Sequence, residues 1–573
     1  MAFVAGVYAR SGLDPLQQME LADLRNALQI GPTDNAGFAC TPRLQLAWIT
    51  LDGSVGSADA SGDGSLALLW GSLYRDGHND VSNYRLLREE AGKNNPGLAD
   101  IGGDFGFAFH DATIDSLSLL TDKFGIRALF VFSTANRVWF SSSLCVMERL
   151  PAVRRVLNLR AAVETAFFGS PLGDRTPYLD VRVLRPGERL RVDARHVRTD
   201  FYWRWNTLPV WRGKRADCLA DLAERFRTAV RRRGGADRRV FCLLSGGLDS
   251  RMIVTALREQ GAQVVACNIS PAGTQDQVYG GEVARALGCQ YAWVPLERGH
   301  KPNLYLQLSK AWRSAAIDSE GPIDRPHWVF VGHGGGAACS GMLYDEELLS
   351  HFRSGRVREG MGLFFKRRGF ELIERLFQRQ YLARMREALV EGVLEQLREF
   401  PCEDPVRSFN LFEMMNDQRR HLHPHWDNAA AHGLQFHLPF FDSQFLERML
   451  SVPVDWTLYH DLYHEWLEQF DPAARSVPWQ VYPGHRSCQV PPIQSFPTQW
   501  EATDKYVLSD RRAWDAPLGK ILAMRPFPEM LNRNYLRYVR LRRAFGGDYG
   551  YAVDAAHKIG DIWARSGGQF EWR

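Results

Sequence analysis

The sequence lacks the features that mark several large classes of protein. No apolar run approaches the ~18 residues of a membrane-spanning helix, and no segment is of low complexity. The nine cysteines are scattered from Cys40 to Cys488 without a CxxC pair, which is typical of a reduced, cytosolic protein rather than of a disulfide framework. The opening MAFVAGVYAR has no basic segment before an apolar core, so we expect no signal peptide.

The chain also has little net charge. Its 70 basic and 66 acidic side chains leave +4 over 573 residues, too little to indicate a nucleic-acid partner. Hydrophobic residues at 45% and charged residues at 24% are usual for a globular protein. At about 150 residues per domain, the length predicts two large domains or three to four smaller ones. We therefore expect a cytoplasmic protein with no nucleic-acid partner and no membrane span.

From Met1 to about Asp200, the sequence predicts a β-rich unit. Short apolar runs alternate with clusters of Gly, Asp and Asn, which is the pattern of strands and turns. A polar, Trp-rich stretch from Tyr202 to Arg215 then indicates a boundary, so we place two domains at 1–205 and 206–573. The strands that we expect in the first domain are 3–7, 66–74, 105–109, 117–120, 129–132 and 138–141.

The second domain begins with an alternation of helices and strands. Apolar residues recur at spacings of three and four over 216–233, which predicts an amphipathic helix. Segments 240–244 and 263–269 are continuous apolar runs, typical of parallel strands that are covered on both faces. Between these strands, the chain turns through two glycines into an apolar helix. The glycine turn thus lies at the carboxyl end of a strand, where open α/β sheets bind ligands.

The turn itself, Ser245-Gly246-Gly247-Leu248-Asp249-Ser250, has the chemistry of an anion site. Its glycines let backbone N–H groups converge on a phosphate, and the start of the next helix adds partial positive charge. Two hydroxyls and the Asp249 carboxylate could hold a phosphate and a bridging Mg²⁺. The loop lacks the lysine of GxxxxGK[ST], which favours a grip on released pyrophosphate over γ-phosphoryl transfer. A plain strand-to-helix turn remains the alternative for the loop taken alone.

The segment FCLLSGGLDSRMIVTAL, residues 241–257, resembles the pyrophosphate loop of the asparagine synthetase family. Residues 103–132 and VLRPGERL near Pro186 resemble that family's amino-terminal glutamine-amidotransferase-like domain, and residues 432–442 resemble the end of its synthetase domain. The resemblance implies an α/β protein with an N-terminal αββα amidotransferase-like sandwich. It also implies a C-terminal PP-loop domain, an adenine-nucleotide α-hydrolase-like parallel sheet with extra helices. It extends to about Val490, and the last eighty residues or so match nothing known to us.

Two departures concern the N-terminal domain. Amidotransferases of this type begin with a cysteine whose thiol attacks glutamine. This chain begins Met1-Ala2-Phe3, and its nearest cysteine is Cys40, so we expect no glutamine hydrolysis. Residues 70–74 (WGSLY) occupy the place of the family's NGEIYN segment without its Asn and Glu. We therefore expect the N-terminal domain to be a scaffold or a docking surface.

A third departure concerns the metal. Residues 331–336 resemble the family's GxGGD loop, but Gly336 stands where that loop ends in a metal-binding aspartate. Asp249 could still hold Mg²⁺ with phosphate oxygens and water, since this ion tolerates one or two protein carboxylates. Asp345 or Glu346 could compensate from nearby in the sequence. An inactive or weakened synthetase domain is the alternative.

If the chain makes no ammonia, the attacking amine must belong to the substrate. Relatives that work in this way include β-lactam synthetases and lasso peptide cyclases, and residues 475–480 resemble an iPW segment of the cyclases. The resemblance therefore implies an ATP-dependent carbon–nitrogen ligase that forms AMP and pyrophosphate. Its substrate would be a leader-cleaved precursor core peptide, whose Asp or Glu side chain it adenylates and joins to the N-terminal amine. A leader peptidase is the implied protein partner.

Three other functions stay open at this point. An ammonia-using asparagine synthetase and a small-ring lactam synthetase would share the adenylation chemistry, with ATP and Mg²⁺ as cofactors. A non-catalytic pseudo-synthetase that binds a peptide or protein would keep only the fold.

Individual site residues follow from the same resemblance. Residues 245–250 would bind ATP and pyrophosphate, with Asp249 as the metal ligand. Leu243, Leu244 and Ile269 lie near strand ends where an adenine ring could pack, although each could equally be core. His333 is the candidate base, because imidazole titrates near neutrality and a tyrosine occupies this place in the β-lactam synthetases.

Other polar residues carry weaker predictions. Glu413, in the helical stretch 411–420, could orient His333, or it could be a charge on the helix surface. His421, His423, His425 and His432 lack a recognisable set of partner ligands, so we expect no zinc there. The basic runs 231–233, 366–368 and 537–543 are expected to be solvated helix faces.

Overall fold

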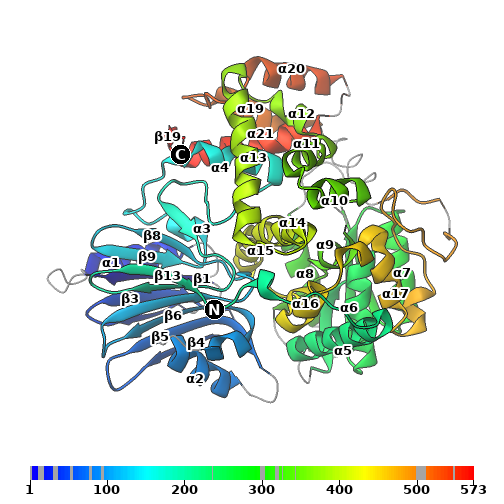
Figure 1. Ribbon diagram of the computed structural model, residues 1–573, viewed down its shortest axis with the longest axis horizontal. Coiled ribbons are helices and arrows are strands. Elements are labelled where there is room, and N and C mark those ends of the chain that lie inside the picture. The colour runs from blue at the N-terminus through cyan, green and yellow to red at the C-terminus, as the bar shows by residue number, and fades with distance from the viewer. Residues whose placement is uncertain are drawn as a thin grey trace.

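The structure is a computed structural model (Figure 1). It describes residues 3–10, 18–29, 36–51, 56–75, 80–91, 96–234, 237–296, 303–316, 322–324, 327–341, 344–493, 495–498, 511–545, 547 and 549–572. No helix within these ranges is both long and apolar enough to cross a membrane.

The N-terminal part is built from two antiparallel sheets of six strands each. Between them lies an apolar core to which both sheets contribute, for example Val4 and Leu46 from one and Leu68 and Leu119 from the other. The first sheet contains β11 (Val181–Val183), β8 (Phe130–Ser133), β9 (Arg137–Ser141), β1 (Phe3–Ala9), β3 (Leu44–Ile49) and β2 (Ala36–Cys40), in that order. The second contains β13 (Val197–Phe201), β12 (Glu188–Val192), β7 (Ser116–Thr121), β6 (Gly102–Asp111), β5 (Leu66–Tyr74) and β4 (Gly56–Ala60).

One helix covers the outer face of each sheet. Leu24 and Ala27 of α1 (Gln18–Ala27) pack on the first sheet. Leu87 and Ala91 of α2 (Asp80–Ala91) pack on the second. The expected αββα sandwich is therefore confirmed, and all six predicted strands lie within or overlap strands of the structure.

The C-terminal part is organised around a five-stranded parallel sheet of order β16-β15-β14-β17-β18. The two predicted buried strands are β14 (Arg239–Leu243) and β15 (Gln263–Ser270), which are neighbours at its centre. The others are β16 (Gln290–Pro295), β17 (Trp328–Phe330) and β18 (Gln435–His437). Helices α5 (Arg215–Gly234), α6 (Leu248–Glu259), α7 (Gln275–Ala286) and α8 (Leu304–Ala316) flank the sheet (Figure 1). The predicted parallel α/β domain is thus confirmed.

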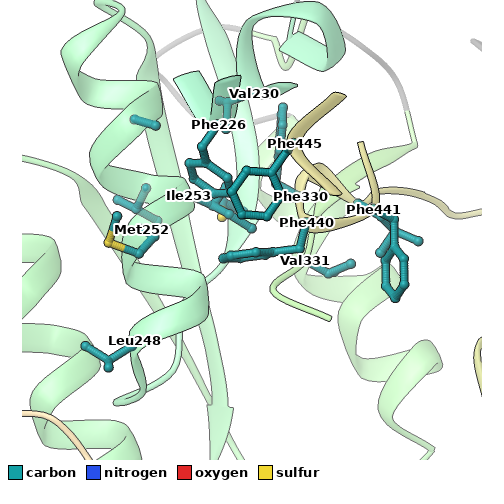
Figure 2. Close-up of a cluster of buried hydrophobic side chains, with 14 of the residues drawn as sticks. Phe226, Val230, Leu248, Met252, Ile253, Phe330, Val331, Phe440, Phe441 and Phe445 are labelled. Atoms are coloured by element: carbon teal, nitrogen blue, oxygen red, sulfur yellow. The ribbon is translucent and has the colours of Figure 1, made fainter. Parts of the chain in front are cut away.

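Figure 2 shows the apolar cluster that fixes the start of α6. Met252 and Ile253 of α6 are fully buried, and Leu248 in its first turn is 7% exposed. Phe226 of α5 packs against Phe440 with ring centroids 4.7 Å apart and the ring planes tilted by 45°. Full burial of each such side chain contributes about 1.5–3 kcal/mol, so the loop before α6 is attached to a well-packed helix.

A helical layer at the top of Figure 1 joins segments that are far apart in the sequence. It contains α4 (Leu159–Phe168), α13 (Leu382–Glu399), α19 (Arg511–Ala523), α20 (Arg533–Ala544) and α21 (Gly550–Arg565), whose apolar faces share one core. Strand β10 (Leu157–Asn158) also pairs in parallel with β19 (Phe570–Glu571). Residues 157–168 thus pack with the end of the chain, although they lie within the predicted domain 1–205.

Arg233 corrects one of our expectations. The basic run 231–233 was expected to be a solvated helix face, but only Arg231 is well exposed, whereas Arg233 is 1% exposed. Its guanidinium lies 2.9 Å from Oδ2 of Asp442 and 3.8 Å from Oδ1 of Asp104, so it connects α5 to β6 of the N-terminal sandwich. It also lies over the ring of Tyr74, 4.9 Å from the ring centre. Arg233 is a buried link between the two parts of the molecule.

Candidate active site

The loop after β14 folds back onto the first turn of α6. Ser245 N donates to Ser250 Oγ at 2.9 Å, and the two serine hydroxyls are 3.0 Å apart. Gly247 N donates to Ser245 Oγ at 3.2 Å, and Gly247 itself caps α6 without a side-chain hydrogen bond. The first turn of this 12-residue helix therefore has no protein side-chain cap, which is the arrangement that favours anion binding.

A second carboxylate, that of Asp276, accepts a hydrogen bond from the loop. Gly246 N donates to Oδ1 of Asp276 at 2.7 Å, and Asn268 Nδ2 donates to Leu244 O at 2.8 Å. A Cβ at position 246 would lie 2.7 Å from Gln275 O, so only glycine fits this close approach to α7. Burial raises the pKa of Asp276 to about 6, although the hydrogen bond from Gly246 opposes the shift. No motif in the sequence points to Asp276, which lies two residues after the Thr274 N-cap that follows β15.

Asp249 lies at the junction of three segments. Tyr463 of α17 (Asp461–Leu467) donates its hydroxyl to Oδ1 at 2.7 Å, and Gly336 N donates to Oδ2 at 2.9 Å. Burial raises the pKa of Asp249 to about 6, while both hydrogen bonds lower it. A Cβ at Gly335 would lie 2.5 Å from Asp249 Cγ, so glycine is required for this approach. Where we predicted a missing carboxylate, the backbone of Gly336 contacts Asp249 directly.

The two residues expected to compensate for that carboxylate are engaged elsewhere. Asp345 caps α10 (Glu346–Arg353) through Leu348 N and pairs with Arg367 at 2.7 Å. Glu346 accepts a hydrogen bond from the Tyr459 hydroxyl. Neither is among the described residues that line the cavities at the loop. Asp276 is the second carboxylate that lies there beside Asp249.

Two cavities share the loop residues Ser245 and Asp249 in their linings. The larger, which we call the nucleotide cavity, has a volume of about 450 Å³, within the usual range for ligand sites. The smaller, which we call the phosphate cavity, has about 140 Å³. The nucleotide cavity is lined by Leu243, Leu244, Ser245, Asp249, Ser250, Cys267, Asn268, Ile269, Asp276, Leu304, Tyr305, Leu308, Val331, Gly332, His333, His425 and Phe436. The phosphate cavity is lined by Ser245, Gly247, Leu248, Asp249, Gly336, His460, Gln480 and Tyr482.

These linings bring most of the predicted site residues together. Leu243, Leu244 and Ile269 all line the nucleotide cavity, as does His333. Gly246 is the member of the predicted loop that lines neither cavity, because its N–H is turned towards Asp276.

His333 belongs to a group of imidazoles at the wall of the nucleotide cavity. Its ring centre lies 5.1 Å from that of His425 and 5.8 Å from that of His421. Tyr305 of α8 and His425 Nδ1 form a hydrogen bond. Burial and the neighbouring imidazoles lower the pKa of His333 to about 3, so its ring is neutral at pH 7 but is a weaker base than the near-neutral titration expected from the sequence. His423 lies apart from this group and bonds Gly125 O at 3.1 Å.

Glu413 is not brought into a hydrogen bond with His333. It is the last residue of α14 (Pro405–Glu413) and is 3% exposed, with Arg368 Nη2 3.8 Å from its Oε2. That oxygen has no hydrogen-bond partner among the described residues. Burial raises the pKa of Glu413 to about 8, so the carboxyl is mostly neutral at pH 7.

Segment 475–480, which resembles iPW, contacts the loop and helix α6. Arg251 is fully buried and donates to the carbonyls of Val477 at 2.7 Å and Pro478 at 2.8 Å. Gln480 N donates to Gly246 O at 3.2 Å. This segment leads into Tyr482, which lines the phosphate cavity with His460 and Gln480. The sequence alone offered no signal for His460, Tyr463 or Tyr482, because no spacing relates them to the loop.

Comparison with known proteins agrees with this site. Residues 86–203 match the family model of the glutamine amidotransferase domain, and residues 221–300 match that of asparagine synthase. One segment of the chain is therefore similar to the glutamine amidotransferase domain, and another is similar to asparagine synthase. The asparagine synthase match contains the whole loop 245–250 and Asp276. No curated protein sequence matches the chain.

Two solved structures are similar to part of the chain. One is described as the allosteric regulatory enzyme of purine biosynthesis, with 12% identity over 52% of this chain and 82% of its own, and a TM-score of 0.25. The other is glutamine phosphoribosylpyrophosphate amidotransferase from B. subtilis, complexed with ADP and GMP, with 11% identity over 55% of this chain and 94% of its own, also at 0.25.

Proposed function

We propose that this ATP-dependent amide-forming ligase is a macrolactam synthetase acting on a leader-cleaved peptide in the cytoplasm. It would adenylate an Asp or Glu side chain and join it to the peptide's N-terminal amine, as a lasso peptide cyclase does. The observation that carries the proposal is that the two cavities at the loop share lining residues. Ser245 and Asp249 face both cavities, so one nucleotide could place its adenosine in the larger and its phosphates in the smaller.

The chemistry needs an activated carboxylate. The substrate carboxylate attacks the α-phosphorus of ATP, the α–β phosphoanhydride bond breaks, and pyrophosphate leaves with the bond's electrons. The amine then attacks the acyl carbon, AMP leaves, and the amine loses one proton. Negative charge grows on the departing pyrophosphate, where donors at the start of α6 are already oriented.

The oxygen donors at the loop fit Mg²⁺. Asp249 and Asp276 are buried carboxylates, and burial raises the pKa of each to about 6. Serine hydroxyls 245 and 250 supply further oxygen atoms, the ligands that Mg²⁺ prefers. When bound, Mg²⁺ would neutralise charge on the phosphate oxygens. Asp249 is the residue that we assign to it, with Asp276 as the second carboxylate of the site.

His333 is the proton acceptor that we propose for the amine. It is neutral, lines the nucleotide cavity and is surrounded by His421, His425 and Phe436. A positioned base typically contributes about 10²- to 10⁴-fold to a rate when its pKa lies near the working pH, so this role requires the bound substrate to raise the pKa of His333 from about 3. The proton would pass from the amine to an imidazole nitrogen of His333.

The N-terminal sandwich supports a scaffold role. Trp70, at the start of the WGSLY segment, is 1% exposed, and its ring lies against Gly106, where a Cβ would be 2.1 Å away. Asp104 is 4% exposed and lies close to Arg233 and Arg127. An aromatic core residue and buried ion pairs thus occupy this face of β5 and β6. We propose that the amine comes from the peptide and not from this domain.

The function is tested with synthetic core peptides that carry a free amino terminus and one internal Asp or Glu. We expect release of AMP and pyrophosphate together with a peptide product that has lost one water. N-acetylation of the same peptide should abolish ring formation. Formation of asparagine from aspartate, ammonia and ATP, with no peptide product, would overturn the proposal in favour of an asparagine synthetase. A leader peptidase is proposed as a partner and would be sought by co-purification.

A further inference from the structure

The phosphate cavity contains no lysine or arginine among the described residues that line it, and the same holds for the nucleotide cavity. A triphosphate brings several negative charges to two carboxylates, Asp249 and Asp276. Imidazoles are the described lining groups that could gain positive charge: His333 and His425 in the nucleotide cavity and His460 in the phosphate cavity. His460 is therefore the described lining group of the phosphate cavity that could gain positive charge.

His460 is held in place by stacked rings. It lies between Tyr463, at 6.1 Å with an 18° angle between ring planes, and Tyr482, at 5.7 Å with a 10° angle. Tyr463 is also the donor to Asp249, so the same ring holds both the imidazole and the metal ligand. His460 is only 6% exposed.

The backbone at His460 is in a costly conformation. Tyr459 has φ 55° and ψ 22°, and His460 has φ 69° and ψ 14°, so two consecutive non-glycine residues are left-handed. Contacts on either side hold the pair: the Tyr459 hydroxyl bonds Glu346, and Arg486 N donates to Tyr459 O at 3.0 Å. Such conformations cluster at functional sites, where the surrounding structure enforces them.

His460 is paired with a second imidazole. Nδ1 of His460 lies 2.6 Å from Nδ1 of His485, so one nitrogen must carry a hydrogen and the other must accept it. In the neutral pair, the donor ring has a bare Nε2, and the acceptor ring carries its hydrogen on Nε2. One further proton can bind the bare Nε2 without breaking the Nδ1 contact. A second would break it, because both Nδ1 atoms would then be donors.

We infer that His460 and His485 form a proton-sharing pair, which takes up one proton when a polyphosphate enters the phosphate cavity. The proton gives the pair a positive charge that attracts the polyphosphate. This inference rests on the proposed nucleotide-binding function and adds a residue pair and a linkage to it. Burial and the neighbouring imidazoles lower the pKa of His460 to about 3, and burial lowers that of His485, so the empty pair is neutral at pH 7. An incoming anion raises the affinity for the proton, which makes the two binding events reciprocal.

The other charged and titratable groups around the pair do not supply this charge. Arg486 Nη1 lies 3.6 Å from Oδ1 of Asp461, and His464 packs edge-on against Trp479, 5.2 Å between ring centres. The titratable groups that contact His460 or act on its charge are Tyr463, Tyr482, His485 and His464, and Asp249 lines the same cavity.

The test uses the full chain and inorganic pyrophosphate with Mg²⁺ as the probe. Calorimetry in two buffers of different ionisation enthalpy gives the number of protons taken up at pH 5.5, which is nearer to the pKa of the pair. We expect the wild-type protein to take up more protons than His460→Asn, with one proton as the upper limit; this substitution tolerates the left-handed backbone. Affinity of the wild type should fall by up to about tenfold per pH unit above the pKa of the loaded pair. His460→Lys, with a fixed charge, should bind pyrophosphate with little dependence on pH between 6 and 9.

His464→Gln is the matched control, since this residue lies on the next turn of α17 and also has a pKa lowered by burial, to about 4. It should leave the proton uptake in place. Equal uptake in the wild type and His460→Asn, with binding intact, would overturn the pair's role and leave the proposed function standing. Absence of any pyrophosphate or Mg²⁺–ATP binding in the wild type would instead overturn the proposed function itself. Near-ultraviolet circular dichroism of each variant checks that the fold is kept.

Discussion

Tyr463 donates its hydroxyl to Oδ1 of Asp249 at 2.7 Å, although 213 residues of chain separate them. The carboxylate assigned to the metal is therefore held by α17 as well as by its own loop. The bond opposes burial, which raises the pKa of Asp249 to about 6.

Tyr463→Phe removes this bond and keeps the ring that stacks on His460. A hydrogen bond to a charged group contributes about 1.5–3 kcal/mol, so the pKa of Asp249 should rise by about one to two units. Because the carboxylate must be ionised to hold Mg²⁺, activity is lost as the pH falls through this pKa. We expect the acid limb of pyrophosphate release to move to higher pH, while rates at pH 9 recover most of the wild-type value. An unmoved acid limb would contradict the role given to Asp249.

Two variants of Asp276 can separate its two proposed roles, which are support of the loop and metal binding. Asp276→Asn keeps an acceptor for Gly246 N but loses the charge, whereas Asp276→Ala loses both. If the carboxylate helps to hold Mg²⁺, the asparagine variant should need about tenfold more Mg²⁺ for half-maximal pyrophosphate release, equal to about 1.4 kcal/mol. The alanine variant should also lose about 1–3 kcal/mol of stability, since Gly246 N is left without its partner. Wild-type Mg²⁺ dependence in Asp276→Asn would show that the residue only supports the loop.

The buried carboxyl of Glu413 should make the free energy of unfolding depend on pH. Burial raises its pKa from 4.5 to about 8 in the folded protein, so the fold binds this proton more tightly than the unfolded chain. The resulting stabilisation is fully present below pH 4.5 and is lost as the pH rises towards about 8, by up to about 1.4 kcal/mol per unit. Glu413→Gln stays neutral, so its free energy of unfolding should gain on that of the wild type between pH 6 and 8. Urea unfolding of both proteins at several pH values measures this, and parallel curves would contradict it.

The buried ion pairs of Arg233 should stabilise the contact between the two parts of the molecule. Arg233→Met leaves Asp442 and Asp104 buried without this cation, and breaking a buried pair in this way costs about 3–5 kcal/mol. Arg231→Met, on the same helix but well exposed, should change stability by less than about 0.5 kcal/mol. Chemical denaturation of the two variants makes the comparison. Similar losses in both would show that the buried network is not a structural link.

Much of the fold could be predicted because local patterns decide it. Segment 240–244 has no polar residue and 216–233 has helical spacing, and these became β14 and α5 within a residue or so. The loop and the adenine-side residues Leu243 and Ile269 followed from the rule that sheets bind ligands at strand ends. What local patterns did not show was long-range: α4 packs with α21, and Arg233 of a basic run is buried because Asp104 and Asp442 lie around it.

Local sequence patterns predicted only the part of the site that lies on the parallel sheet. Ser245–Ser250 and Asp276 lie on consecutive elements of the sheet, so sequence order places them close together. His460, Tyr463 and Tyr482 come from segments more than 200 residues later, and no spacing relates them to the loop. The pairing of His333 with Glu413 was proposed from residue types alone, and the structure places imidazoles beside His333 instead.

The central claim is that ATP is cleaved to AMP and pyrophosphate at the loop 245–250. Pyrophosphate release in the presence of a core peptide, measured for the wild type and for Asp249→Ala, tests it most directly, with circular dichroism to show that the variant is folded. We expect the folded variant to lose at least about 10²-fold in rate, as expected when a group that stabilises developing charge is removed. Full turnover in Asp249→Ala would contradict the account.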